Sequence, residues 1–119
     1  MLIIRKEQMD ALGAHMRARF ESRMIEHIRN NFPDRTNNVS NEDIRTVMQY
    51  GTKKAEYYGI EYEGDIRRFI EYLVIYGTQL DAKEETRWMV DILRRDDLDG
   101  TSKMDSIDNC ELQLLRDLS

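Results

Sequence analysis

Apolar residues recur three and four positions apart along most of this chain, a spacing typical of helices that bury one face. The clearest run consists of Ile44, Val47, Met48, Gly51 and Ala55. One proline and six glycines in 119 residues are too few for a protein of many strands and tight turns. Strand-like alternation is limited to Leu2-Ile3-Ile4. We therefore predict an all-α fold, a compact bundle of about five helices in a single domain over residues 1–119.

The predicted helices cover about residues 6–31, 40–58, 65–76, 82–95 and 102–118. Ser40 and Ser102 are predicted N-caps, because each hydroxyl precedes a carboxylate three residues later. Gly59 and Gly77 are predicted helix ends, because glycine readily adopts the positive φ that stops a helix. Gly51 lies inside an apolar face, which indicates close approach of another helix.

The predicted core consists of the apolar stripes. The helix ending at Tyr76 is the most hydrophobic and is expected to be central. In the fourth helix the predicted buried residues are Trp88, Met89, Ile92 and Leu93. In the last helix they are Met104, Ile107, Cys110, Leu114, Leu115 and Leu118. Cys110 is thus expected to be a buried structural thiol.

No motif in the sequence indicates catalysis, a cofactor or a metal. Cys110 is the only cysteine, so no zinc site can be built from cysteines. His15 and His27 are twelve residues apart, whereas two metal ligands on one helix prefer a spacing of four. Carboxylates such as Glu61 and Glu63 fall in loops and first helical turns, where they complement the helix dipole. We therefore expect a non-enzymatic protein without cofactor.

The charge and the apolar runs limit the kinds of partner. The net charge of −5 argues against a nucleic-acid binder, whose affinity comes from neutralising phosphates. The N-terminal residues lack the apolar stretch of a signal peptide. The longest uncharged apolar run, Tyr72 to Gly77, is too short to cross a bilayer. We expect a cytoplasmic protein that binds neither nucleic acid nor membrane.

All six tyrosines lie between residues 50 and 76, which makes this segment the best candidate for a contact surface. Three of them, Tyr58, Tyr72 and Tyr76, fit the edges of apolar stripes and are predicted to pack. Tyr50, Tyr57 and Tyr62 fall outside the stripes. Together with Glu61 and Glu63 they form the predicted partner-binding surface. The sequence also leaves a homodimer open.

Three segments carry a resemblance to a known group of proteins. They are IRKEQMDAL (4–12), FESRMIEHIRNNFP (20–33), and YGIEYEGDIRRFIEYLVIYG (58–77) followed by Trp88 and Ile92-Leu93. The chain resembles small helical bacterial proteins found in type VI secretion and polymorphic-toxin gene clusters. The resemblance implies an accessory role, such as an adaptor for a secreted effector. The implied partner is a secretion spike, an effector or a toxin.

Other functions remain open at this point. The first is an immunity protein or antitoxin that blocks a toxin with its acidic face. The second is a small enzyme that uses carboxylates for acid–base chemistry, which would require acids converging in a pocket. The third is a transcriptional regulator, which would require a basic face despite the net negative charge.

Overall fold

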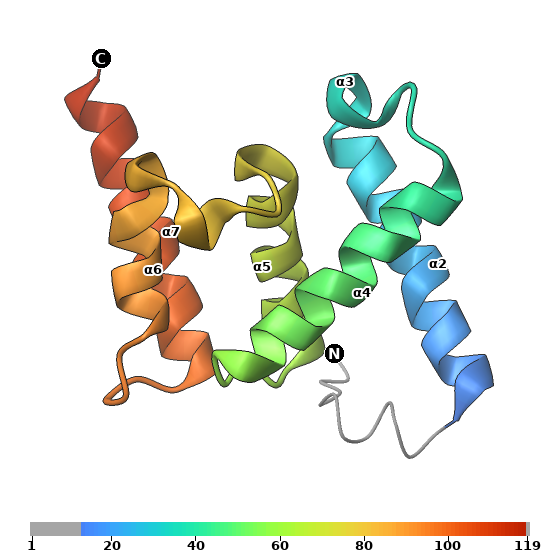
Figure 1. The fold of residues 1–119 in the computed structure, drawn as a ribbon, viewed down its shortest axis with the longest axis horizontal. Coiled ribbons are helices and arrows are strands. Elements are labelled where there is room, and N and C mark those ends of the chain that lie inside the picture. The colour runs from blue at the N-terminus through green and yellow to red at the C-terminus, as the bar shows by residue number, and fades with distance from the viewer. Residues whose placement is uncertain (1–12, 119) are drawn as a thin grey trace.

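A computed structural model describes residues 13–118 of the chain, without the side chains of Ala14 and Met16. This part is all-α, as predicted, and forms a bundle (Figure 1). Its elements are α2 (Ala14–Asn31), α3 (Pro33–Thr36), α4 (Asn41–Tyr57), α5 (Glu63–Tyr76), the 3-10 helices η1 (Leu80–Ala82) and η2 (Glu84–Thr86), α6 (Arg87–Leu93) and α7 (Gly100–Asp117).

Helix α5 is central, as its apolar sequence predicted. It packs against α4 on one side and against α7 on the other, while α2 packs on α4 and α6 packs on α7 (Figure 1). Phe69, Ile66 and Ile70 of α5 are fully buried. One connected core joins these side chains to residues of α2, α4, α6 and α7. Burial of such side chains is the main force that holds a bundle of this size together.

The turn between α4 and α5 is built as the sequence predicted. Gly59 has a φ of 78°, which only glycine adopts easily. The amide of Ile60 donates to the carbonyl of Ala55 at 2.9 Å, and the amide of Gly59 donates to the carbonyl of Glu56 at 3.0 Å. These two bonds define a Schellman motif, and the fully buried Ile60 supplies its hydrophobic contact.

Gly51 explains how α4 and α5 come close together. A Cβ at this position would lie 2.8 Å from Ile70 Cγ1 and from Leu73 Cδ1, both on α5. The prediction that Gly51 allows close approach of another helix is therefore confirmed. Ser40 caps the start of α4, since its hydroxyl accepts a hydrogen bond from the amide of Asp43 at 3.1 Å.

The start of α7 docks on that same turn. A Cβ at Gly100 would lie 2.7 Å from the Gly59 carbonyl oxygen and from the Cα of Ile60. One turn later Lys103 is buried, and its ammonium donates to the carbonyl of Tyr58 at 2.7 Å. The lysine thus satisfies a carbonyl left over at the end of α4. The junction joins three helices through backbone contacts.

Two helix starts differ from the prediction. The first predicted helix runs through Gly13, but Gly13 has a φ of 87° and α2 begins after it; the predicted start near residue 6 lies outside the described residues. Helix α7 begins at Gly100 rather than at Ser102. Its N-cap is Asp99, whose carboxylate accepts from the amide of Ser102 at 2.8 Å. Aspartate and serine are both common N-cap residues, and in this helix the Asp99 carboxylate is the group that caps the first turn.

The predicted helix over residues 82–95 is also shorter than expected. The 3-10 helix η1 ends where the prediction begins, residues 84–86 form the 3-10 helix η2, and only Arg87–Leu93 is α-helical. The hydroxyl of the buried Thr86 donates to the carbonyl of Leu80, which holds the chain in a turn. Such side-chain bonds to the backbone compete with regular helix. Of the predicted core residues of this segment, Met89 and Leu93 are fully buried, whereas Trp88 and Ile92 are half-buried at the edge of the core.

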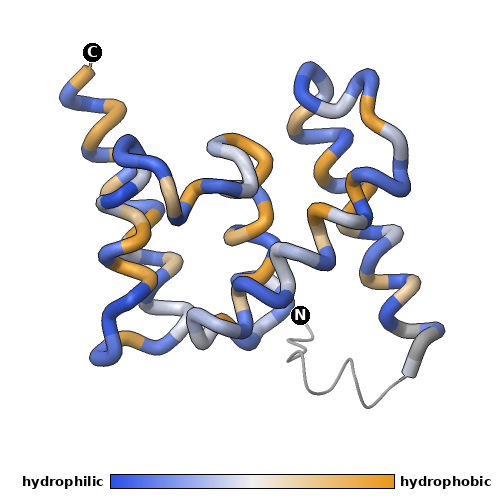
Figure 2. The backbone as a smooth tube through the Cα atoms, viewed as in Figure 1, coloured by the Kyte–Doolittle hydropathy of each residue, from blue (hydrophilic) through white to orange (hydrophobic). Residues whose placement is uncertain are grey.

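The end of α7 contradicts the predicted core. Cys110 is exposed, and so are Leu114, Leu115 and Leu118. The stripe is apolar, but the last turns of α7 extend past the elements that cover its first half (Figure 1). Burial therefore ends at Ile107, which is fully buried. In Figure 2 the colours of hydrophobic and of hydrophilic residues alternate along the projecting end of α7.

Candidate functional site

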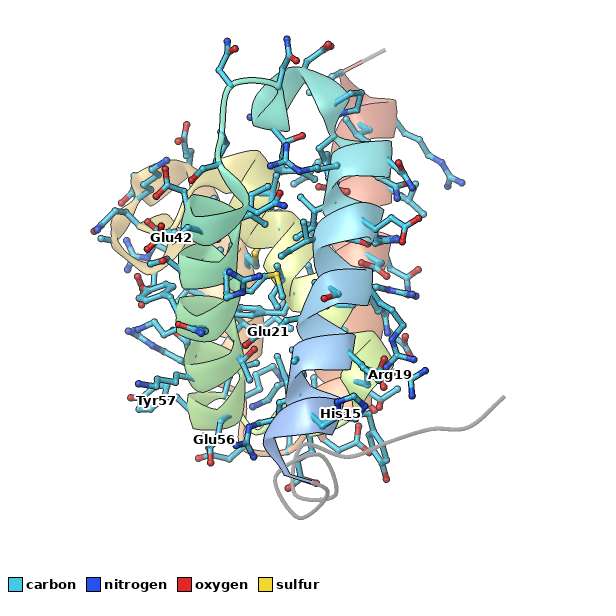
Figure 3. The ribbon with its side chains drawn as sticks, turned by 90° about the vertical axis from the view of Figure 1, so that its right-hand side faces the viewer. His15, Arg19, Glu21, Glu42, Glu56 and Tyr57 are labelled. Atoms are coloured by element: carbon cyan, nitrogen blue, oxygen red, sulfur yellow. The ribbon has the colours of Figure 1, made fainter. Side chains whose placement is uncertain are left out.

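Two of the predicted contact tyrosines share the outer face of α4. Tyr50 and Tyr57 lie seven residues apart, which places them on one side of a helix. Tyr57 is 77% exposed and Tyr50 is 38% exposed. In Figure 3 Tyr57 points away from the body of the protein. Together with Lys53 and Lys54 they form what we call the α4 tyrosine face.

The ring of Tyr57 is held in place although it is exposed. It packs edge-to-face against Tyr58, with ring centroids 5.1 Å apart, and Lys54 Nζ lies 5.6 Å from its centroid. Lys54 is itself fixed by Asp81 at 2.5 Å, and this hydrogen bond raises the pKa of Lys54 against the opposing effect of burial. An exposed aromatic ring that is already ordered loses little conformational entropy on binding.

Tyr50 is anchored at the other end of the same face. Its hydroxyl donates to the carbonyl of Thr78 at 3.1 Å, which connects α4 to the segment after α5. Tyr50 is thus partly exposed to solvent while its hydroxyl is engaged in a hydrogen bond. Tyr58 and Tyr72 are buried and Tyr76 is half-buried, as predicted for the packing tyrosines.

The remaining predicted contact residues do not gather on this face as one group. Glu61 is exposed in the turn between α4 and α5. Tyr62 is half-buried and forms the N-cap of α5. Glu63 is half-buried and pairs with Arg23 of α2 at 3.5 Å. Glu63 therefore ties α5 to α2, whereas Tyr50 and Tyr57 belong to the outer face of α4.

A polar cluster between α5 and α7 was not predicted. Arg68 of α5 contacts three carboxylates, namely Asp65 at 3.0 Å, Asp105 at 2.8 Å and Asp108 at 2.6 Å. The hydroxyl of Thr101 donates to the buried Asp65 at 2.5 Å. Burial by itself would lower the pKa of Arg68. Its hydrogen bonds to Asp108 and Asp105 have the larger combined effect and raise the pKa above the ordinary value. Because a cation lies among the acids, the cluster has the form of an ion-pair network joining two helices.

Two tyrosines extend this cluster along the same seam. The hydroxyl of Tyr72 donates to Asp108 at 2.6 Å, and that of Tyr76 donates to Glu111 at 2.9 Å. The two rings stack with centroids 6.2 Å apart. Burial and these hydrogen bonds raise the pKa of both phenols, that of Tyr76 to about 12. In the sequence, Tyr72 and Tyr76 stand one helical turn apart, which places both hydroxyls on one side of the helix. Their hydrogen-bond acceptors lie on another helix, so the sequence pattern does not identify them.

The raised pKa of these phenols predicts a loss of stability in alkali. The unfolded chain ionises tyrosine near pH 10, whereas the folded chain keeps Tyr76 neutral up to about pH 12. The stabilisation is therefore complete below pH 10 and is lost as the pH rises towards 12. The double variant Tyr72→Phe and Tyr76→Phe lacks both phenol groups. Its free energy of unfolding is therefore expected to fall less steeply with rising pH than that of the unmodified protein. Urea unfolding midpoints measured from pH 9 to 12 check this; parallel curves for the two proteins would contradict it.

His27 is engaged rather than free to bind a ligand. Its Nε2 contacts a carboxylate oxygen of Glu71 on α5, and Asn31 donates to its carbonyl at 2.7 Å. His15 is exposed on α2 (Figure 3). Over residues 13–118 no group of three or more His, Cys, Asp or Glu residues is arranged to hold a metal ion. Within the same residues no helix is long and apolar enough to span a membrane.

Comparisons of this chain with protein families, with curated proteins and with solved structures each found no match.

Proposed function

We propose that this chain is a non-enzymatic protein-binding module and that the α4 tyrosine face contacts its partner. The observation that carries the proposal is Tyr57, a large aromatic side chain that is 77% exposed and yet ordered by Tyr58 and Lys54. Tyrosine is enriched at the energetic centres of protein interfaces, because its ring is apolar and its hydroxyl still forms hydrogen bonds. Tyr50 adds a second ring to the same face.

The polar groups around the rings favour a protein partner over a small ligand. Lys53 and Glu56 are exposed beside Tyr57 and provide a charged rim. An apolar centre with a polar rim is the usual arrangement of a protein interface. The acids of the α5–α7 seam, in contrast, share ion pairs with Arg68, which argues for a structural role rather than for acid–base chemistry.

The biological setting proposed is a bacterial secreted-effector system, and it rests on the sequence resemblance alone. In this setting the partner is a secretion spike or an effector, and the chain acts as an adaptor. The second candidate is an immunity protein, which the net charge of −5 favours if the toxin site is basic. Expression of the chain beside the toxin of the same gene cluster separates the two, because only an immunity protein restores growth.

Photo-crosslinking followed by mutation tests the contact surface. A photoreactive amino acid at position 57 is expected to capture the partner in cells, while the same group at the exposed position 49, a quarter-turn away on α4, captures less. With the partner identified, Tyr57→Ala is expected to weaken binding about 10- to 30-fold, as for a central interface tyrosine. Gln49→Ala is the matched control and is expected to leave affinity unchanged.

Folding is monitored in the same experiment. Because Tyr57 is largely exposed, Tyr57→Ala is expected to shift the free energy of unfolding by no more than about 0.5 kcal/mol. Equal affinity of the Tyr57→Ala variant and the unmodified protein would reject this surface as the contact site.

A further inference from the structure

The chain contains two adjacent pairs of basic residues in which one member forms an ion pair and the other does not. Lys54 pairs with Asp81 at 2.5 Å, and Arg95 pairs with a neighbouring aspartate at 2.6 Å. Lys53 and Arg94 are exposed, and neither forms an ion pair within residues 13–118. A charge that no internal acid neutralises can complement an opposite charge on a partner protein.

Lys53 lies in the middle of the α4 tyrosine face. It comes three residues after Tyr50 and four residues before Tyr57, so its side chain is a neighbour of both on the surface of the helix. The nearest acid along α4 is Glu56, three residues later, and Lys53 forms no ion pair with it. The face therefore presents a cation next to its two exposed rings.

The hydroxyl of Tyr58 is a second group at this face that has no partner. Tyr58 is 4% exposed and packs edge-to-face on Tyr57, with ring centroids 5.1 Å apart. Within residues 13–118 its hydroxyl forms no hydrogen bond. In the same part of the chain every fully buried side-chain nitrogen or oxygen has a partner, so this hydroxyl reaches the surface. It is thus able to donate to an acceptor on another molecule.

Arg94, at the end of α6, brings a second free cation to this hydroxyl. Burial and the charge of Asp81 raise the pKa of Tyr58, and the charges of Lys54 and Arg94 act against that rise. Because such effects weaken with distance, Arg94 lies near the Tyr58 hydroxyl although it belongs to another helix. A free cation therefore lies near each of the two packed rings, one supplied by α4 and one by α6.

We propose that the α4 tyrosine face binds an acidic segment of its protein partner. One carboxylate of the segment pairs with Lys53. Another meets Arg94 and accepts a hydrogen bond from the Tyr58 hydroxyl, while apolar groups of the segment pack on the ring of Tyr57. This inference rests on the function proposed above and specifies the chemistry of the partner.

The charge of the whole protein favours a short acidic segment over a nucleic acid. The net charge is −5, so a long polyanion that extends beyond the two free cations is repelled by the rest of the surface. A short segment of a protein needs to meet only the cations of this face. The rings add apolar contact area, which a protein segment with leucine or another apolar residue between its acids can use.

Titration of the isotope-labelled protein with two synthetic peptides tests the sign of the partner's charge. One peptide consists of glutamate and leucine, and the other has lysine in place of each glutamate. The glutamate peptide is expected to shift the backbone amide resonances of Lys53, Tyr57 and Arg94, whereas the lysine peptide is expected to leave them in place. Equal shifts with both peptides, or none with the glutamate peptide, overturn the proposal. Larger shifts with single-stranded oligothymidylate also overturn it and assign the face to nucleic acid.

Charge reversal separates the two local cations from the net charge. Lys53→Glu and Arg94→Glu are each expected to weaken binding of the glutamate peptide about 5- to 10-fold, because an attraction becomes a repulsion. Arg67→Glu is the matched control. Arg67 is exposed and forms no ion pair within residues 13–118, and on α5 it lies between Glu63 and Glu71, which pair with α2.

Arg67→Glu changes the net charge by the same amount and is expected to leave the affinity unchanged. Equal weakening in all three variants would mean that only the net charge matters, and it would overturn the proposal. Circular dichroism and thermal unfolding confirm that each variant is folded.

The partner captured by photo-crosslinking distinguishes this inference from the proposed function. If Tyr57→Ala weakens its binding and the reversals at Lys53 and Arg94 do not, the face is the contact site but the segment that it binds is not acidic. If none of the three changes weakens its binding, the face itself is rejected as the contact site. Weakening by all three supports both proposals.

Discussion

Gly100→Ala is expected to lower the free energy of unfolding by about 1–3 kcal/mol, as overpacking of a tight contact does. The new methyl group would lie 2.7 Å from the Gly59 carbonyl oxygen and from the Cα of Ile60. Both are backbone atoms, so the contact cannot be relieved by rotating a side chain. The start of α7 must move away from the α4–α5 turn, which also weakens the bond from Lys103 to Tyr58.

The destabilisation expected for Gly100→Ala is opposite to the effect that helix propensity alone would give. Alanine in place of glycine within a helix normally stabilises by about 0.5–1 kcal/mol. Gly64 near the start of α5 is the matched control, because a Cβ there meets no heavy atom within 4 Å. Gly64→Ala is expected to stabilise by about 0.4–1 kcal/mol. Urea unfolding of both variants measures the difference; equal effects at the two sites would contradict the close contact at Gly100.

Arg68→Met is expected to cost about 2–3 kcal/mol of stability, somewhat less than breaking a fully buried ion pair. The side chains of Arg68 and Asp65 are 24% and 10% exposed, so solvent screens this pair only in part. Asp105 and Asp108 are 61% and 41% exposed and contribute less, because solvent screens them more strongly. Methionine retains most of the volume but leaves Asp65, Asp105 and Asp108 without their cation. Three like charges then repel one another across the α5–α7 seam.

Arg67→Met is the matched control for this change, because Arg67 is the neighbouring residue of α5 and is exposed. It is expected to alter the free energy of unfolding by less than about 0.5 kcal/mol. Urea unfolding at pH 7 compares the two variants. Indistinguishable midpoints would mean that the Arg68 cluster contributes no net stability.

The features predicted correctly from sequence are those decided within a few residues. Gly59 ends α4 because positive φ is a local property of glycine, and Ile60 follows it into the same turn. Ser40 caps α4 through an amide three residues away. Tyr57 lies outside the apolar stripe predicted for its own helix; the stripe faces the core and Tyr57 is exposed.

The features that were missed depend on residues far apart in the chain. Arg68 meets Asp105 and Asp108 from another helix, and Lys103 reaches the carbonyl of Tyr58 across the junction of α4 and α7. In the sequence these residues look like solvated charges. No periodicity shows which side chains of two separate helices will meet once the helices pack.

What the sequence determined by itself is the class of fold, most of the helices and the positions where α4 and α5 end, because periodicity and glycine φ act locally. The tertiary structure alone decided which apolar stripes are covered. Leu114, Leu115 and Leu118 continue the stripe of Met104 and Ile107, yet they are exposed. An amphipathic pattern shows only that a helix has an apolar face, whereas burial requires a second element long enough to reach it. At the end of α7 no other helix described in residues 13–118 buries the leucines.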